Sequence, residues 1–171
     1  MPTKITCGIS NKDFAEAAKA VRKYQKDLLA KAKTLLKLLT NQGAVIARTI
    51  VVQMDAIDKG YLANSINAFY DPSSNIGFVR VDCDYAVFVE FGTGVRGVGS
   101  PYPGDAMSKV AYHYGDGTCY VMLTDGRVGW FYPADDGTMK FTEGMPSRPF
   151  MFETGQMLHR QVAQMAKEVF R

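Results

Sequence analysis

The 171-residue sequence has little of the material from which catalytic and metal sites are usually built. It holds two histidines, His113 and His159, which lie in separate and distant runs. A Ser–His–Asp triad or a three-histidine metal site therefore has almost no residues to draw on. The sequence also contains no G-x-S-x-G motif and no P-loop, and its glycine pairs are too isolated to indicate a phosphate site. We therefore expect no enzymatic activity, no cofactor and no resident metal.

Cysteine is also scarce, with three residues at Cys7, Cys83 and Cys119. None belongs to a C-x-x-C pair, which argues against a zinc ribbon or a thioredoxin-like site. Free thiols in a reducing cytoplasm are the simplest interpretation, and an incidental disulfide or a reactive thiol is the alternative. The N-terminus lacks the apolar region of a secretory signal, and no uninterrupted apolar run reaches the roughly 18 residues that span a bilayer. We therefore expect neither secretion nor a membrane partner.

The charge is small in total but unevenly distributed along the chain. The formal net charge is +3. Residues 1–45 contain nine Lys/Arg and three Asp/Glu, a balance of +6, whereas residues 46–171 contain eleven and fourteen, a balance of −3. Such asymmetry predicts a charged surface that meets nucleic acid or an acidic patch on a neighbouring subunit.

The most strongly patterned element is a long amphipathic helix near the N-terminus. Ser10 and Asp13 can satisfy the free N–H groups at its start. Apolar residues then recur at steps of three, four and seven as far as Leu39, which is helical spacing close to a heptad. A row of lysines on the other face, here called the lysine stripe, is either a solvated surface or a contact for an acidic partner or DNA. The stripe consists of Lys12, Lys19, Lys23, Lys26, Lys33 and Lys37.

The remaining helices complete an expected single α+β domain over residues 1–171. The sequence T-N-Q-G at residues 40–43 should end the first helix, because such residues commonly close helices. A second helix should follow over about residues 44–57. A last helix over about residues 153–170 is expected to pack on a small antiparallel sheet.

The sheet is predicted from alternation and from turn residues. Apolar and polar residues alternate over 79–85, which indicates a half-buried strand after a turn at residues 71–75. The segment that follows, as far as Phe91, fits either a continued strand or a short helix. Residues 95–145 are rich in glycine, aromatics and Asp-Gly pairs, so we expect a loop or hairpin insertion there.

The nearest approach to a metal or hydrolytic site is a set of three carboxylates. Asp82 and Asp84 share one face of the expected strand, and Glu90 follows six residues later. A divalent ion could bind such oxygens, although the same alternation also makes an ordinary solvent-facing strand. A metal-dependent hydrolase is therefore an alternative, and it predicts that Asp84→Ala abolishes a metal-dependent activity.

Three short segments are more specific in their order and spacing than any one of them alone. The first is I-D-K-G-Y-L-A-N-S-I at 57–66, the second is Y-A-V-F-V-E-F-G-T-G at 85–94, and the third is G-M-P-S-R-P-F-M at 144–151. An aromatic G-W-F-Y run at 129–132 lies between the last two. The residues that carry the three motifs are Asp58, Gly60, Leu62, Ser65, Ile66, Tyr85, Glu90, Phe91, Gly92, Thr93, Pro149 and Phe150.

In these segments the chain resembles a head–tail joining (neck or tail-completion) family of tailed bacteriophages, the gene-product-ten-like minor structural proteins of lambda-like phages. The resemblance covers roughly residues 40–171. It departs from the family where Ala56-Ile57 replaces a proline and Lys59 replaces a threonine. It implies a virion structural protein in the neck, assembled in the host bacterial cytoplasm. Its implied partners are its own copies in a ring of six or twelve, head-closure or connector proteins, and the tail terminator or tail tube protein.

The motif residues also have structural explanations, and the contact residues are expected elsewhere. Glycines can adopt backbone conformations closed to other residues, the apolar members can fill a core, and Glu90 can pair with a cation or cap a backbone. The candidate interface residues are the lysine stripe, Trp130 and Tyr132. The alternative function is a basic-helix nucleic-acid-binding module, which predicts duplex binding with a steep salt dependence.

Overall fold

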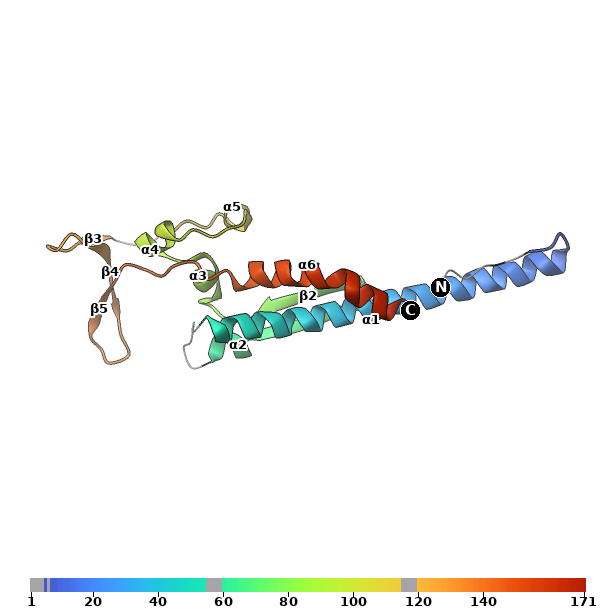
Figure 1. The fold of residues 1–171 in the computed structure, drawn as a ribbon. Helices are drawn as coiled ribbons and strands as arrows, with labels where there is room; N and C mark the ends of the chain where they lie inside the picture. Colours follow the sequence, from blue (N-terminus) through green and yellow to red (C-terminus); the bar gives the residue numbers. More distant parts are fainter. Residues whose placement is uncertain (1–4, 6, 55–59, 115–119) are drawn as a thin grey trace.

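The computed structural model describes residues 5, 7–54, 60–114 and 120–171, which form an elongated α+β molecule (Figure 1). Strands β1 and β2 form one antiparallel hairpin, and β3, β4 and β5 form a second antiparallel sheet in that order. The α+β class is therefore confirmed. The elements are α1 (Asn11–Gln53), α2 (Tyr61–Asn64), β1 (Ile66–Asp71), β2 (Ile76–Val81), α3 (Ala86–Phe91), α4 (Gly94–Gly99), α5 (Ala106–Lys109), β3 (Val121–Met122), β4 (Val128–Pro133), β5 (Met139–Thr142) and α6 (Phe150–Val169).

Helix α1 is one uninterrupted helix of 43 residues. It begins as expected, since the Ser10 hydroxyl accepts from the Asp13 N–H while the Asp13 carboxylate accepts from the Ser10 N–H. This reciprocal capping box satisfies N–H groups that the helix itself cannot. The predicted break at residues 40–43 is wrong, and the expected second helix is the C-terminal part of α1.

The residues that suggested a break serve the packing of α1. A β-carbon on Gly43 would lie 3.0 Å from Leu158 Cδ1 on α6 and 3.1 Å from Val79 Cγ2 on β2. The glycine therefore lets two other elements approach the helix closely. The Thr40 hydroxyl donates to the Leu36 carbonyl at 2.8 Å, so this residue is satisfied inside the helix.

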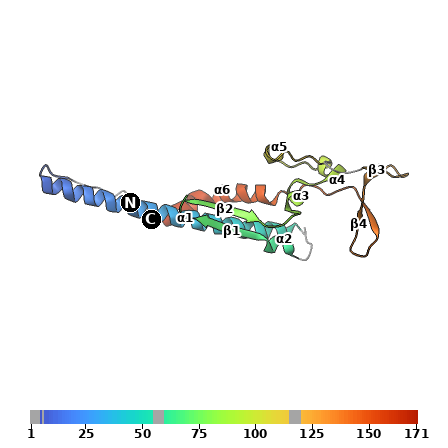
Figure 2. The ribbon, with the colours of Figure 1, turned by 180° about the vertical axis from the view of Figure 1, so that it is seen from behind.

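The central body lies where the C-terminal part of α1 meets the β1–β2 hairpin and α6 (Figures 1 and 2). Helix α6 begins at Phe150, before the expected residue 153, and its main packing partner is α1 rather than the sheet. The buried apolar core consists of Ala44, Ile46, Ala47, Ile50, Val51, Leu62, Ile66, Val89 and Phe150.

The same helix has the composition of a membrane span over part of its length. One 18-residue window of α1 has a mean hydropathy of 1.3, and 39% of that window is buried inside the molecule. A helix that packs in the core of a protein can have the same length and mean hydropathy as a membrane-spanning helix. All seven fully buried residues of α1 lie between Thr40 and Val51, where the body packs on it.

The first hairpin differs in its limits from the predicted strand. Strand β2 begins at Ile76 and ends at Val81, and it pairs with β1, which the sequence analysis did not predict. The predicted turn at residues 71–75 is confirmed. The Asp71 carboxylate accepts hydrogen bonds from Ser73 and Ser74, and those bonds lower the pKa of Asp71 to about 2.

The expected insertion forms the end of the molecule opposite the N-terminal part of α1 (Figure 1). The segment that fitted either a strand or a helix is helix α3, and it leads through α4 and α5 into the sheet of β3, β4 and β5. The Asp-Gly pairs at 125–126 and 136–137 lie in the two turns of that sheet. The third predicted turn, at 115–117, lies outside the described residues.

Candidate assembly interfaces

The second and third motifs meet at one junction, where α6 begins beside α3. The Glu90 carboxylate accepts hydrogen bonds from the backbone N–H groups of Met151 at 2.9 Å and Phe152 at 3.0 Å. These donors belong to the first turn of α6 and have no partner within that helix. The Ser147 hydroxyl donates to the Glu90 carbonyl at 2.7 Å. Glu90 therefore takes the second of its two expected roles and caps the C-terminal helix from a distant element.

Glu90 is also the only charged residue in the core of the described chain. Its side chain is 7% exposed. Burial raises the pKa of Glu90, whereas the hydrogen bonds from α6 and from the Tyr102 hydroxyl act in the opposite direction. Burial and the neighbouring Glu90 charge likewise raise the pKa of Tyr102. The arrangement is that of a structural cap, since both carboxylate oxygens accept hydrogen bonds from the first turn of α6.

Gly92 and Thr93 complete this junction. Gly92 has a φ of +81°, and a β-carbon there would lie 2.5 Å from the Ser147 nitrogen. Other residues are therefore excluded by both conformation and contact. The Thr93 N–H donates to the Met145 carbonyl at 2.8 Å, and the Met145 N–H returns a bond to the Thr93 carbonyl at 3.1 Å. The glycine-threonine pair thus ties the second motif to the third.

The other motif residues are mostly core residues. Leu62 and Ile66 are fully buried, and the buried Ser65 hydroxyl donates to the Leu62 carbonyl at 2.8 Å. Gly60, with a φ of +76°, precedes α2. Asp58 lies outside the described residues. Two further motif residues, Tyr85 and Phe150, belong to the same core or pack against it, and Pro149 directly precedes α6.

Phe91 packs in an aromatic cluster that the sequence analysis missed. Its ring lies 4.8 Å from the ring of Tyr102 and 5.0 Å from the ring of Tyr112. The Tyr112 hydroxyl also donates to the Gly92 carbonyl at 2.6 Å. Sequence spacing carried no signal for this cluster, because Tyr102 and Tyr112 come from loops whose course depends on tertiary packing.

The three carboxylates considered as a metal site do not come together. Asp82 forms an ion pair with Arg80 at 2.7 Å, and Glu90 is engaged by the first turn of α6. Within the described ranges, no group of three or more His, Cys, Asp or Glu residues could hold a metal ion.

Four lysines of the stripe, Lys12 to Lys26, lie on the N-terminal part of α1, which projects beyond the body as a lone helix (Figures 1 and 2). Lys33 and Lys37 lie where the body begins, near Phe170 and Tyr70 respectively. We call residues 11–32 of α1 the arm. Every residue from 18 to 30 is exposed, and all six lysines of the stripe are exposed as well. No ion pair that joins two described residues involves the stripe. Lys37 lies 5.0 Å from the centre of the Tyr70 ring.

The two aromatic interface candidates have different surroundings. Trp130 is half-buried, and a β-carbon on Gly94 would lie 2.6 Å from its ring, so Trp130 holds the second sheet against α4. Tyr132 is exposed on the same sheet. Met122, at 75% exposure, adds to this surface. Met122 and Tyr132 are exposed on the same side of this sheet, a surface here called the far face, whereas Phe131 and Met139 are exposed on the opposite side.

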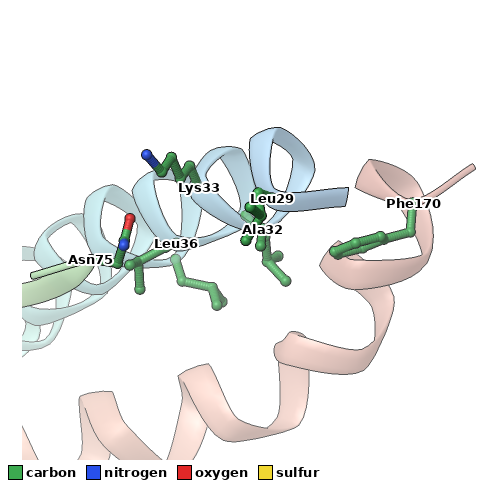
Figure 3. Close-up of a pocket in the computed structure, with 8 residues that line it drawn as sticks. Leu29, Ala32, Lys33, Leu36, Asn75 and Phe170 are labelled. Carbon is green, nitrogen blue, oxygen red and sulfur yellow. The ribbon is translucent and has the colours of Figure 1, made fainter. Parts of the chain in front are cut away.

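An open apolar groove of about 370 Å³ lies at the base of the arm (Figure 3). Figure 3 shows Phe170, just after α6, facing α1 across this space. The groove is lined by Leu29, Ala32, Lys33, Leu35, Leu36 and Leu39 of α1, by Asn75, and by Phe170.

Comparison of the chain with protein-family models, with curated proteins and with solved structures gave no match.

Proposed function

We propose that the chain is a virion structural protein of a tailed phage or prophage, a ring-forming subunit of the neck that joins the head to the tail. The observation that carries the proposal is the placement of two exposed contact surfaces at opposite ends of one elongated body. One end presents the charged arm, and the other presents the far face. Apolar patches of this kind mark interaction sites. The proposal also rests on the resemblance of the three motifs to the neck family.

A ring requires each subunit to contact two neighbours through two different surfaces. The body separates the arm from the far face, so both surfaces can be occupied at once. The lysine stripe supplies positive charge that forms no ion pair among the described residues, and electrostatic complementarity would select an acidic neighbouring subunit for it. The motif residues have a supporting role, since they hold α3, α6 and the second sheet in place.

The proposal is tested by reversing the charge of the stripe. Lys19, Lys26 and Lys33 are exposed and touch no core residue, so changing all three to Glu should leave the fold intact. Heads and tails should fail to join, because the new glutamates would face the acidic surface of the neighbouring subunit and repel it by several kcal/mol. We expect the yield of infectious particles to fall at least about tenfold. Unjoined heads and tails, counted by electron microscopy, should accumulate.

The matched control carries the same change in net charge elsewhere. Lys109, Arg160 and Lys167 are also exposed, and their triple change to Glu should give normal particles. Normal yields from the stripe variant would exclude the stripe as a contact in the neck. Equal failure of both variants would instead show that net charge alone matters.

Nucleic acid is the second candidate partner, and the same stripe favours it. Lysine side chains on a helix surface attract phosphates but by themselves read no bases. Binding to any DNA duplex should then weaken steeply as salt rises. Duplex binding at physiological salt that the stripe variant loses would identify DNA in the lumen of the neck as the partner.

A further inference from the structure

The body presents a free strand edge on the side of the hairpin where β2 lies next to α6 (Figure 2). The Asp82 N–H donates to the Ser65 carbonyl at 3.0 Å, and this bond fixes which facing residues of the hairpin are hydrogen-bonded pairs. The backbone groups of Gly77, Val79 and Val81 therefore point away from β1. Among the described residues, no hydrogen bond from another element reaches these groups. Such an edge is a template for one more strand.

An apolar groove of about 270 Å³, here called the β2 groove, lies beside this edge. Its wall on the α6 side includes Met151, Gly155 and Leu158. A β-carbon on Gly155 would meet nothing within 4 Å, so the space next to this part of α6 is open. A strand added to β2 would lie about 4.8 Å from it. Its alternate side chains would then point into the β2 groove, as in other complexes in which a peptide extends a sheet.

The segment that precedes the arm has the pattern of such a strand. Ile5, Cys7 and Ile9 alternate with Thr6 and Gly8, which is the spacing of a strand with one apolar face. We call residues 5–9 the entry segment. All three of its apolar residues are exposed, and Ile9 is 98% exposed. The apolar face of the entry segment is therefore available to another molecule.

We propose that the entry segment of one copy of this chain adds as a strand to the free edge of β2 in a second copy. Its three apolar residues face the β2 groove of that copy. The contact joins two different surfaces, the start of the arm and the side of the body. Contacts of this kind close into rings or extend into filaments. The contact deepens the proposed function, on which it rests for the closure of the copies into a ring.

The entry segment cannot reach the β2 groove of its own chain. A β-carbon on Gly77 would overlap the Thr40 hydroxyl, so the free edge lies beside this residue of α1. Thr40 follows Ser10 by 30 residues, which is about 45 Å along a helix. The five residues of the entry segment extend over at most about 18 Å. Only the entry segment of another copy can therefore occupy the groove.

The response to salt separates this contact from a contact of the lysine stripe. Salt screens the attraction between exposed charges, so an acidic neighbour should release the stripe at high salt. Backbone hydrogen bonds and buried apolar side chains are screened much less. The strand contact should therefore persist at high salt, which is the condition chosen for its test.

Two variants block opposite sides of the contact. Ile5→Asp/Ile9→Asp places charges on the apolar face of the entry segment, where burial in the groove would be unfavourable. Gly155→Leu fills part of the β2 groove with a side chain. All three positions are exposed, so both variants should fold. Each should self-associate at least about tenfold more weakly than wild type in analytical ultracentrifugation at high salt.

Matched controls carry the same kinds of change at exposed positions outside the contact. Ala15→Asp/Ala20→Asp places two charges on the arm, and Gln164→Leu places a leucine on the opposite side of α6 from Gly155. Both controls should associate as wild type does. Equal association by the blocked variants and the controls would place the interface elsewhere, and a wild-type chain that stays monomeric at high concentration has no such contact.

Mixing the two blocked variants is the decisive experiment. Ile5→Asp/Ile9→Asp keeps an intact β2 groove, and Gly155→Leu keeps an intact entry segment. Together they should form a one-to-one dimer and no larger species, because only one contact of each pair of copies remains. A mixture that stays monomeric would overturn the strand contact, whereas the particle yields of the stripe variant test the neck function separately.

Discussion

Glu90 lies 60 residues before the helix that it caps, and it is buried there without a cation. Its two carboxylate oxygens satisfy two N–H groups of α6, while Gly92 and Thr93 fix the neighbouring backbone. The family-like motif Y-A-V-F-V-E-F-G-T-G thus acts through a few atoms at one junction.

Glu90→Gln should destabilise the fold by about 1–3 kcal/mol, because the amide nitrogen cannot accept and one buried N–H loses its partner. Urea denaturation followed by circular dichroism measures the change in the free energy of unfolding. Glu153→Gln is the control, since Glu153 is exposed in the same turn of α6, and it should change stability by less than about 0.5 kcal/mol.

The pH dependence of this difference has a definite sign. Because burial raises the pKa of Glu90 above its ordinary value of 4.5, the folded chain binds the proton more tightly than the unfolded chain. The contribution of Glu90 to stability therefore falls as the pH rises from about 4.5 through the raised pKa. Glu90→Gln should lack this pH-dependent component. The difference in the free energy of unfolding between wild type and Glu90→Gln should therefore be largest at low pH. A deficit that grows with pH would contradict the raised pKa.

At the scale of elements, close packing overrides local helix signals. The sequence around Gly43 predicts the end of a helix. The helix nevertheless continues, because α6 and β2 pack closely against it at this residue. Gly155 in α6 offers a contrast, since a β-carbon on it would meet nothing within 4 Å. The two glycines share a helical environment and differ only in the space around them.

Gly155→Leu should stabilise the chain by about 1 kcal/mol through helix propensity. Gly43→Leu should destabilise it by about 1–3 kcal/mol in spite of the same gain, because the side chain would displace Leu158 and Val79. Thermal unfolding of both variants measures the difference. Equal stabilisation would mean that the three elements are not closely packed at Gly43.

At the scale of the whole molecule, the far face is the counterpart of the arm. Deleting residues 97–126 would remove Met122 of the far face together with Tyr102 and Tyr112, which pack on Phe91. Such a deletion would therefore disturb the junction as well as the far face. Point changes at exposed residues separate the two effects. They leave the aromatic cluster and Trp130 in place.

Met122→Asp/Tyr132→Asp should leave stability within about 0.5 kcal/mol of wild type, because both side chains are largely exposed. The double variant should nevertheless reduce particle completion, since charge in an apolar contact is strongly unfavourable. Complementation of a phage that lacks the gene, scored as infectious titre, measures the effect. A normal titre would show that the far face is not a contact surface.

Local patterns in the sequence were sufficient for several features. The capping box at Ser10, the near-heptad spacing of the apolar residues in α1 and the turn after Asp71 depend on neighbours within a few residues. Such features carry their own signals, and the α+β class follows from their order. The strand β1 gave no comparable signal, because its pairing with β2 depends on the helix behind it.

The sequence by itself determined that a long basic amphipathic helix begins at Ser10 and that charge is concentrated on it. Only the tertiary structure decided that this helix runs through Gly43, that Glu90 meets α6, and that the body ends before the helix does. The physical reason is range: capping and periodicity act within one or two helical turns, whereas burial depends on which distant elements pack together. The apolar stripe of α1 could be recognised in the sequence, but its exposure over residues 18–30 is a property of the whole fold.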